Sequence, residues 1–505
     1  MKKYTFLLII PALIMQLSCN KNLDPKEYST LTNENAFNTE SDAIAAVNSI
    51  YARLKGPSVG DNYDYWTVRH FALTDLTTDD GHCSYGGDPG QLSLVQWNSA
   101  NGLIAEDYGQ IYKLIANANS AIFNITPMTS ITAAEKAQFL AEAKFLRAVA
   151  YMDLTDIWGP VILTTEKDLA NPNYTSQPPV TSVANIEALL ISDLTSAASV
   201  LPLNYQNNAI YATNDVGRAT KGAAMALLGR LYLRQHQWQK AADMEESVIN
   251  LGVYQLYPSY SGLFLEANQW CSENIFSVIS DANVNGTELL NHFGPLLHPT
   301  IQNRWQYYAV TWYFYHSFSD QDDRKKEFFP VYKGVDGLIH EEAPTPGATP
   351  PAGYYYMPDV ATSKYADSTG SKGYYDSHSV DILRYADVLL SRAEALNELN
   401  GPNAESISLI NQVKARSHAV LLNLGDYNQT TLRAAISQER GWEFFYEGKH
   451  RADLLRMGLY DVTVNAYLKA IGQTNTVVLP KDEYFPYPLS QTQINPNLSN
   501  AGREQ

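Results

Sequence analysis

The sequence predicts an all-α protein: a tetratricopeptide-like helical repeat scaffold that carries a large loop-rich subdomain. Apolar residues recur at helical spacing over two long stretches, roughly 40–255 and 380–457. Alternating patterns typical of strands are scarce. Between these stretches, residues 256–380 lose the periodicity, are rich in adjacent aromatics and contain a Pro/Gly run from Ala343 to Gly353. Together these observations favour helices that hold irregular loops.

The chain begins with a segment that predicts export. Two lysines precede an apolar run from Phe6 to Met15, and a small residue, Ser18, stands before Cys19. This order is typical of a signal peptide, and the run is too short to span a bilayer. Residues 1–18 resemble a bacterial lipoprotein signal, with Cys19 as the lipidation site. Gln16 stands where the usual pattern has Leu, so ordinary secretion is the alternative.

Residues 19–255 are predicted to form the N-terminal helical scaffold, interrupted by a loop insertion at 56–103. The motif Leu228-Gly229-x-x-Tyr232, followed by Ala241 after a turn, matches the helix-turn-helix signature of a tetratricopeptide repeat. Gly229 keeps its helix narrow, so that a partner helix can approach closely. We therefore expect stacked helix pairs in this part of the chain.

Residues 256–380 are predicted to be an aromatic, loop-rich subdomain, and residues 381–505 to complete the helical scaffold. A second helix pair is expected at 382–399 and 403–417, separated by the stop signal Gly401-Pro402. A rigid scaffold that carries two aromatic loop regions is the arrangement expected of a binding protein, because loops carry recognition residues.

Charge and motifs exclude several classes of function. The chain has 36 basic and 53 acidic residues, a net charge of −17, and removal of residues 1–18 takes away two lysines and leaves −19. Such a charge argues against a nucleic-acid partner. The sequence has no P-loop, nucleophile elbow or Cys/His spacing typical of a metal site. We therefore expect no cofactor and no metal. Cys83 and Cys271 either pair or remain thiols.

Several motifs, in order along the chain, resemble the SusD/RagB-like outer-membrane lipoproteins of Bacteroidetes. The series spans nearly the whole chain after the signal segment. It consists of Asn35-Ala-Phe37, Ala143-Lys-Phe-Leu-Arg147 with Trp158-Gly159-Pro160, Ala219-Thr-Lys-Gly-Ala-Ala224, Leu383-Arg384-Tyr385, Glu439-Arg440-x-x-Glu443-x-x-x-Glu447-Gly448 with Asp453-Leu454-x-Arg456, and Ile494-Asn495-Pro496. His450 stands where the family usually has Arg, and the chain lacks the family's closing Gln-Asn.

The resemblance implies a surface-exposed, lipid-anchored outer-membrane protein that binds glycan without catalysis. It would deliver oligosaccharide or polysaccharide to a SusC-like TonB-dependent transporter. A minority branch of the family handles peptides, so the peptide-binding subunit of a RagB-like uptake complex is one alternative. A surface glycoside hydrolase is the other, but the adjacent acidic pairs Asp79-Asp80, Asp322-Asp323 and Glu341-Glu342 are not arranged as catalytic carboxylates.

Aromatic residues in the two loop regions are the candidate ligand contacts. A pyranose ring has an apolar face that stacks on Trp or Tyr, while polar side chains bond its hydroxyls. The predicted site therefore consists of stacking residues and their polar neighbours: Trp66, Tyr85, Trp270, Trp305, Tyr307, Tyr308, Trp312 and Tyr315, with Asp80, Asn98, Asn303 and Arg304. Tyr354-Tyr355-Tyr356 is an alternative contact for the transporter.

Other conspicuous residues are assigned to the scaffold. Glu439, Glu443 and Glu447 are spaced on one helical face and need cations to offset their repulsion. The nearest candidates are Arg440, Arg451 and Arg456. We expect the tryptophans outside the set of ligand contacts to pack cores beside helices: Trp97, Trp158, Trp238 and Trp442.

Overall fold

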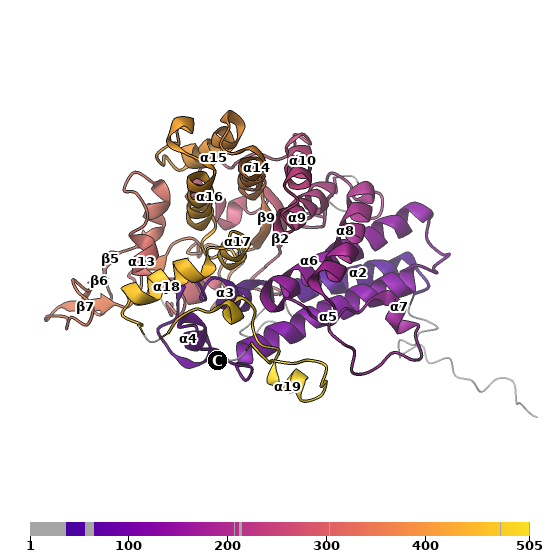
Figure 1. Cartoon of the computed structure of the whole chain (residues 1–505), viewed down its shortest axis with the longest axis horizontal. Helices are drawn as coiled ribbons and strands as arrows, with labels where there is room; N and C mark the ends of the chain where they lie inside the picture. Colours follow the sequence, from indigo (N-terminus) through magenta and orange to yellow (C-terminus); the bar gives the residue numbers. More distant parts are fainter. Residues whose placement is uncertain are drawn as a thin grey trace, which may run out of the picture.

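The computed structural model describes residues 37–55, 65–206, 208–211, 215–301, 304–474 and 476–503. About half of the chain is helical, and the strands are few and short. Figure 1 shows long helices of the first half of the chain on one side, the helices within residues 385–444 at the top, and a small sheet that projects from the opposite side. The predicted helical scaffold with a loop-rich part is confirmed.

The helices of the scaffold pack in series along the chain. α5 contacts α6, α6 contacts α8, α8 contacts α9, and α9 contacts α10. The bounds of these first elements are α2 (Glu40–Lys55), α3 (His70–Thr74), α4 (Gly87–Ser93), α5 (Gly102–Ile125), α6 (Ala133–Trp158), α7 (Glu166–Leu169), α8 (Val183–Val200), α9 (Lys221–Arg234) and α10 (Trp238–Ile249). One of them, α8, is long and apolar enough to cross a membrane, and it packs between α6 and α9.

Local sequence explains where these helices begin and how closely they pack. Thr132 and Glu135 form a capping box at the start of α6, and Thr220 caps α9 through the backbone N–H of Ala223. Gly229 allows α10 to approach α9, because a Cβ at this position would lie 2.3 Å from Glu245 Oε1. The pair that the tetratricopeptide signature predicts is therefore α9 and α10.

The late helices continue the same stack after a long interruption. α10 contacts α14, and α14 contacts both α15 and α16. The remaining helices are α11 (Tyr260–Leu263), α12 (Leu289–Phe293), α13 (Trp312–Tyr315), α14 (Tyr385–Asn400), α15 (Ala404–Arg416), α16 (Gln429–Phe444), α17 (His450–Arg456), α18 (Tyr460–Ala470) and α19 (Leu489–Thr492). The predicted second pair is α14 and α15, which are separated by Gly401 at φ +73° and by Asn403, the N-cap of α15.

The loop-rich part contains short strands that the sequence did not indicate. They are β1 (Gly81–His82), β2 (Asn274–Val278), β3 (Ala309–Val310), β4 (Phe328–Phe329), β5 (Val331–Lys333), β6 (Ile339–Glu342), β7 (Tyr354–Met357), β8 (Ala361–Thr362) and β9 (Val380–Arg384). β2 pairs with β9, β4 with β8, and β5, β6 and β7 form the projecting sheet. Most are too short to show a period of two, which is why helical periodicity alone missed them.

The pairing of β2 with β9 holds the loop-rich part at its base. Val278 lies opposite Val380, and Phe276 opposite Leu383, so the chain leaves and rejoins the scaffold at neighbouring positions. The helix expected from residue 382 therefore starts only at Tyr385, because Ile382 and Leu383 are buried in β9. The scaffold stays continuous from α10 to α14 while the chain between them forms the loops.

The acidic residues of α16 belong to a buried ion-pair network. Arg384 bonds Glu443, and its Nε lies 2.8 Å from Glu447 Oε2, while Arg324 lies 2.8 Å from Glu439. Glu447 follows the end of α16 rather than continuing its face. Although burial acts to raise it, the guanidinium groups of Arg416, Arg384 and Arg324 lower the pKa of Glu443 to about 2. The predicted network is thus present.

The cations predicted for this network were wrong. Arg440 bonds Asp387 and Asp453, Arg456 bonds Glu394 and Asp453, and Arg451 donates to the carbonyls of Asp482 and Glu483. Arg440 follows Glu439 directly on a helix, so the two side chains point in different directions. Most of the cations that meet the three glutamates come from other segments, namely Arg324, Lys364, Arg384, Lys414 and Arg416, and Lys449 lies 3.4 Å from Glu447.

The tryptophans assigned to the scaffold differ in how deeply they are buried. Trp97 and Trp158 are buried in the core, as expected. Trp238 is partly exposed and stacks on His236, and Trp442 donates from Nε1 to Ser317 Oγ at 2.9 Å. Cys83 and Cys271 are free thiols. Cys19 lies outside the described residues.

Candidate functional site

The two aromatic loop regions meet through the pairing of β1 with β3. Gly81 lies opposite Val310, and His82 opposite Ala309, in an antiparallel pair. The chain therefore runs from β1 toward Tyr85 while its partner strand comes from Tyr307. Because the strands are antiparallel, residues just after β1 lie beside residues just before β3. This register brings aromatics from distant parts of the sequence together.

Four aromatic side chains form a continuous group that we call the aromatic platform: Tyr85, Trp305, Tyr307 and Tyr374. The rings of Tyr85 and Tyr307 stack with centroids 5.0 Å apart and planes 23° apart. The hydroxyl of Tyr85 donates to the carbonyl of Trp305 at 3.0 Å, and the Trp305 ring lies 5.9 Å from that of Tyr374. Tyr85 is 56% exposed and Tyr374 59% exposed. The two outer rings thus face solvent, while Trp305 and Tyr307 are half-buried between them and the core.

Buried side chains hold the platform from below. The imidazole of His292 contacts the rings of Trp305 and Tyr307 edge to face, with centroids at 5.2 Å and 5.8 Å. Burial lowers the pKa of His292 to about 4, so this ring is neutral at pH 7. Asn291 donates to the carbonyl of Tyr374 and accepts from Arg304 at 2.7 Å. These contacts hold Trp305, Tyr307 and Tyr374 against buried side chains.

Three of these residues, Tyr374, His292 and Asn291, were missed by sequence reasoning. Tyr374 and Tyr375 follow Gly373 in the predicted loop region, and this pair of adjacent tyrosines was the available signal. His292 lies in the short helix α12 and carries no sequence pattern that separates it from a core residue. Tyr85, Trp305, Tyr307 and Arg304 were predicted and do lie together.

Three predicted residues are buried and offer no surface to a ligand. Trp66 is 2% exposed and stacks on His70, with centroids 3.9 Å apart. Tyr308 and Asp80 are fully buried, and burial raises the pKa of Asp80 to about 6. Neighbouring segments cover these three side chains, so they are not among the proposed ligand contacts.

Trp312 and Tyr315 form a separate group on α13. Trp312 donates from Nε1 to the carbonyl of Met357 at 3.1 Å, and its ring meets that of Tyr315 edge to face at 5.5 Å. The amino group of Lys325 lies 5.1 Å from the centre of the Tyr315 ring. Both side chains are half-buried and tie α13 to the projecting sheet and its neighbours.

The remaining predicted residues lie elsewhere. Trp270 is 40% exposed and lines two hollows that contain no residue of the aromatic platform. Asn98 is exposed in a loop beside the C-terminal segment, where Ser99 accepts from the backbone of Leu489 at 2.8 Å. Asn303 lies outside the described residues.

The adjacent acidic pairs are occupied by structural contacts. Asp79 Oδ1 lies 2.8 Å from His450 Nε2, and Asp322 lies 2.7 Å from Arg324. Glu342 lies 2.8 Å from His316 on the surface. Within the described parts of the chain, no group of three or more His, Cys, Asp or Glu could hold a metal ion.

Comparison with known proteins relates both halves of the chain to one family. A model of the SusD family matches residues 303–502, and a model named "Starch-binding associating with outer membrane" matches residues 21–233. The SusD-like protein P25 of Formosa agariphila is 24% identical, over 95% of this chain and 95% of that protein.

Solved structures share the fold over nearly the full length. A SusD-like carbohydrate binding protein from Bacteroides fragilis has a TM-score of 0.76 and 23% identity, and the match covers 92% of this chain and 99% of that one. Surface glycan-binding protein A from Bacteroides thetaiotaomicron, in complex with laminarihexaose, has a TM-score of 0.73 and 20% identity, with 90% and 97% covered. With family models matching at both ends and this fold between them, the chain belongs to the SusD/RagB-like family.

Proposed function

We propose that this protein binds uncharged oligosaccharide or polysaccharide at the aromatic platform and does so without catalysis. One observation carries the proposal: Tyr85, Trp305, Tyr307 and Tyr374 form an aromatic surface whose outer rings, Tyr85 and Tyr374, are open to solvent. Aromatic faces of this kind suit the apolar faces of successive pyranose rings. Tyrosine also presents a hydroxyl at the ring edge, which can bond sugar hydroxyls.

Contacts among the platform side chains restrict their freedom, and this favours binding. Tyr85 and Tyr307 brace each other, and Trp305 is supported by His292. Fewer side chains lose freedom when a ligand arrives, so less of the stacking energy is spent on ordering them. Arg304 lies beside Trp305 and bonds Asn291, and it is our candidate for a polar contact with sugar hydroxyls at the edge of the platform.

Relatives support the glycan as ligand. The structural neighbour from Bacteroides fragilis is a carbohydrate binding protein, and the one from Bacteroides thetaiotaomicron holds laminarihexaose. The chain's own charge is compatible with this class, because a neutral sugar is indifferent to a net charge of −17.

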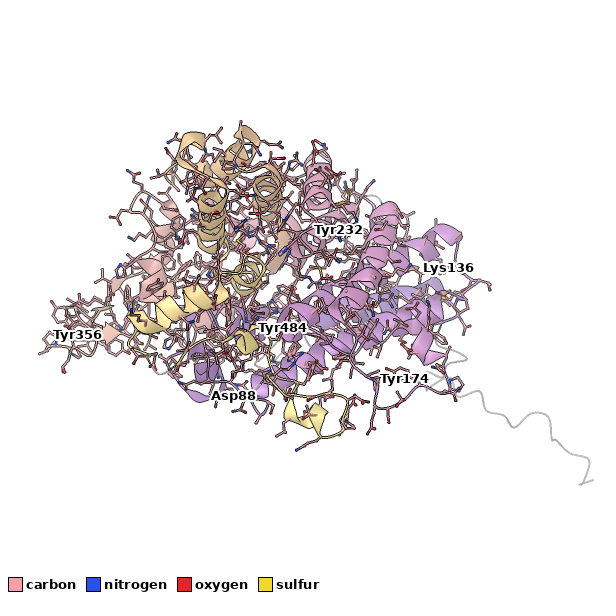
Figure 2. The ribbon with its side chains drawn as sticks, viewed as in Figure 1. Asp88, Lys136, Tyr174, Tyr232, Tyr356 and Tyr484 are labelled. Carbon is pink, nitrogen blue, oxygen red and sulfur yellow. The ribbon has the colours of Figure 1, made fainter. Side chains whose placement is uncertain are left out.

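We place the protein on the outer face of the outer membrane, anchored by lipid on Cys19, as a partner of a SusC-like TonB-dependent transporter. The family model associated with the outer membrane supports the location. β7 lies at the edge of the projecting sheet, and Figure 2 shows its Tyr356 at the end of that projection. Tyr354, Tyr355 and Tyr356 are half-buried there and are the proposed transporter contact. Co-purification with the transporter, lost on Cys19→Ala or on alanine substitution of the three tyrosines, tests this arrangement.

Affinity electrophoresis and calorimetry against laminarin, soluble starch, xylan and a peptide library test the binding function. We expect a neutral polysaccharide to bind, and the double variant Trp305→Ala/Tyr374→Ala to lower its affinity at least about tenfold, as expected for the loss of hot-spot aromatics. Trp238→Ala is the matched control, since Trp238 is a partly exposed tryptophan on α10, away from the platform.

Two alternatives predict different results. A peptide-binding subunit would retain peptides from the library and ignore every glycan. A glycoside hydrolase would release reducing sugar from the bound polysaccharide, whereas we expect the polymer to be recovered intact. The contacts that already occupy the adjacent acidic pairs favour binding over hydrolysis.

A further inference from the structure

The structure has a second concave surface, which shares no residue with the aromatic platform. Trp270 forms a wall shared by two hollows. The first has a volume of about 510 Å³ and is lined by Asn204, Gln206, Tyr254 and Ser272, among others. The second is shallow, with a volume of about 570 Å³, and its lining includes Gln269 and Thr369. We call the two together the Trp270 groove.

The indole of Trp270 is placed to stack on a ligand. It lines both hollows and is 40% exposed. On one side it is close to Gly217, where an added Cβ would lie 3.5 Å from Trp270 Cζ3 and 2.4 Å from the side chain of Ile279. Gly217 has φ +83°, so this close approach depends on glycine. The ring is therefore supported from one side and open on another.

Polar groups in the first hollow are left without protein partners. Among the described residues, the indole Nε1 of Trp270, the carboxamide of Gln206 and the hydroxyl of Ser272 make no hydrogen bond to protein. A hollow that combines an aromatic face with unused donors and acceptors fits a sugar, which has both an apolar face and a rim of hydroxyls. Its volume lies in the range of small-molecule sites.

The charges around the groove favour a neutral ligand. Arg218 lines the first hollow, but its guanidinium already bonds Asp215 at 2.8 Å, Glu142 at 3.1 Å and Asn48 at 2.7 Å. The second hollow is lined by the carboxylates of Glu266 and Asp281. With the guanidinium committed and carboxylates in the wall, an anionic glycan would be repelled.

The groove and the platform are close enough to hold one chain. Gly370 lines the second hollow, and Tyr374 of the platform is four residues further along. Four residues span at most about 14 Å even when fully extended. An extended polysaccharide that rests on Tyr374 is therefore within reach of the groove.

We propose that the Trp270 groove is a second carbohydrate-binding site, which holds another stretch of the same neutral glycan with one pyranose stacked on Trp270. The inference rests on glycan binding at the platform and adds a distinct second site. Two linked sites on one polymer strengthen binding, because the second contact becomes intramolecular. A short oligosaccharide gains nothing from this linkage and fills the sites independently.

Calorimetry with the polysaccharide that binds best in the panel, and with its disaccharide, which is too short to bridge the two sites, tests the proposal. We expect two disaccharides per wild-type protein, and one per Trp270→Ala or Trp305→Ala/Tyr374→Ala variant. For the polymer, Trp270→Ala should lower the affinity about tenfold or more, as expected when linked binding is lost. Trp238→Ala should change neither quantity, and thermal unfolding verifies that each variant is folded.

A second measurement reports on Trp270 directly. In protein labelled with 5-fluorotryptophan, the ¹⁹F signal of Trp270 is the one absent from Trp270→Phe, and Trp305→Ala/Tyr374→Ala keeps the groove while it removes the platform. The disaccharide should shift this signal in the platform variant, and a sulfated or uronate polymer should not.

Three outcomes would overturn the proposal. If wild type binds glycan but Trp270→Ala has unchanged stoichiometry and affinity and the ¹⁹F signal is static, the groove is not a site and the platform stands. If wild type binds no glycan, platform and groove fail together. If light scattering shows a wild-type dimer that Trp270→Ala dissociates, the groove is instead a protein interface, covered through its exposed apolar residues Leu203, Val216, Val253 and Ile279.

Discussion

Identical residue types perform opposite roles in this protein, depending on what covers them. Trp66 and Trp305 both lie in predicted aromatic loops, yet Trp66 is buried against His70 and Trp305 is part of the open platform. Whether each tryptophan is covered or exposed depends largely on neighbours from distant segments. Local sequence carries no information about such neighbours, so composition located the aromatic regions but not the individual contacts.

Substitution should separate the two roles. Trp305→Ala/Tyr374→Ala should reduce glycan affinity at least about tenfold while leaving the free energy of unfolding nearly unchanged. Trp66→Ala should cost about 3–5 kcal/mol of stability, because it empties a buried site, and leave the affinity of the folded fraction unchanged. Urea unfolding and calorimetry on the same samples measure both. A large affinity loss in folded Trp66→Ala would contradict the assignment.

His450 should make stability depend on pH. Although burial acts to lower it, the carboxylates of Asp80 and Asp79 raise the pKa of His450 to about 9. A histidine whose folded pKa exceeds its unfolded value near 6.5 stabilises fully below pH 6.5, and this contribution is lost as pH rises through 9. We expect His450→Gln to be less stable than wild type by up to about 3 kcal/mol at pH 6 and by much less at pH 9.5.

Urea titrations at the two pH values measure this difference. His316→Gln is the control, because His316 is exposed, with 55% of its side chain accessible. A wild-type advantage over His450→Gln that is equal at both pH values would show that His450 acts only through packing.

At the scale of elements, helices and two of their sequence-adjacent pairs were predictable, whereas the pairing of the short strands was not. Caps, glycines and apolar spacing located α9, α10, α14 and α15. The pairing of β1 with β3 joins residues 81–82 to 309–310, and each strand has two residues. Such short strands have no readable period, and the contact that creates the platform is long-range. The family motifs predicted the scaffold, whereas the site required coordinates.

The ion pairs of α16 should be necessary for the stability of the fold, because they are buried. Arg384 bonds Glu273, Glu443 and Glu447 and is itself fully buried. Arg384→Met would leave carboxylates without their cation, which costs about 3–5 kcal/mol when one partner of a buried pair is removed. Arg433→Met is the matched control, because Arg433 pairs with Glu398 near the surface and should cost about 1 kcal/mol or less. Equal losses in urea unfolding would contradict this explanation.

For the whole molecule, the acidic charge predicts how binding responds to salt. A neutral glycan makes no ion pair with the protein, so its affinity should change by less than about twofold between low and high NaCl. A cationic peptide attracted to a net charge of −17 would bind more weakly as salt screens the field. Calorimetry across a salt series distinguishes them, and a steep fall in glycan affinity would point to a charged ligand.

The pairing of β2 with β9 bears on how such proteins diversify. Val278 and Val380 are partners across one strand pair, so the intervening chain starts and ends at adjacent points. That chain carries Trp305, Tyr307 and Tyr374, yet α10 and α14 contact each other without it. An insert from a relative could be grafted between these two valines to exchange ligand preference, provided it also supplies counterparts of Arg324 for Glu439 and Glu443 and of Lys364 for Glu447. The base strands thus allow the segment that carries most of the proposed ligand contacts to be exchanged while the helical frame stays constant.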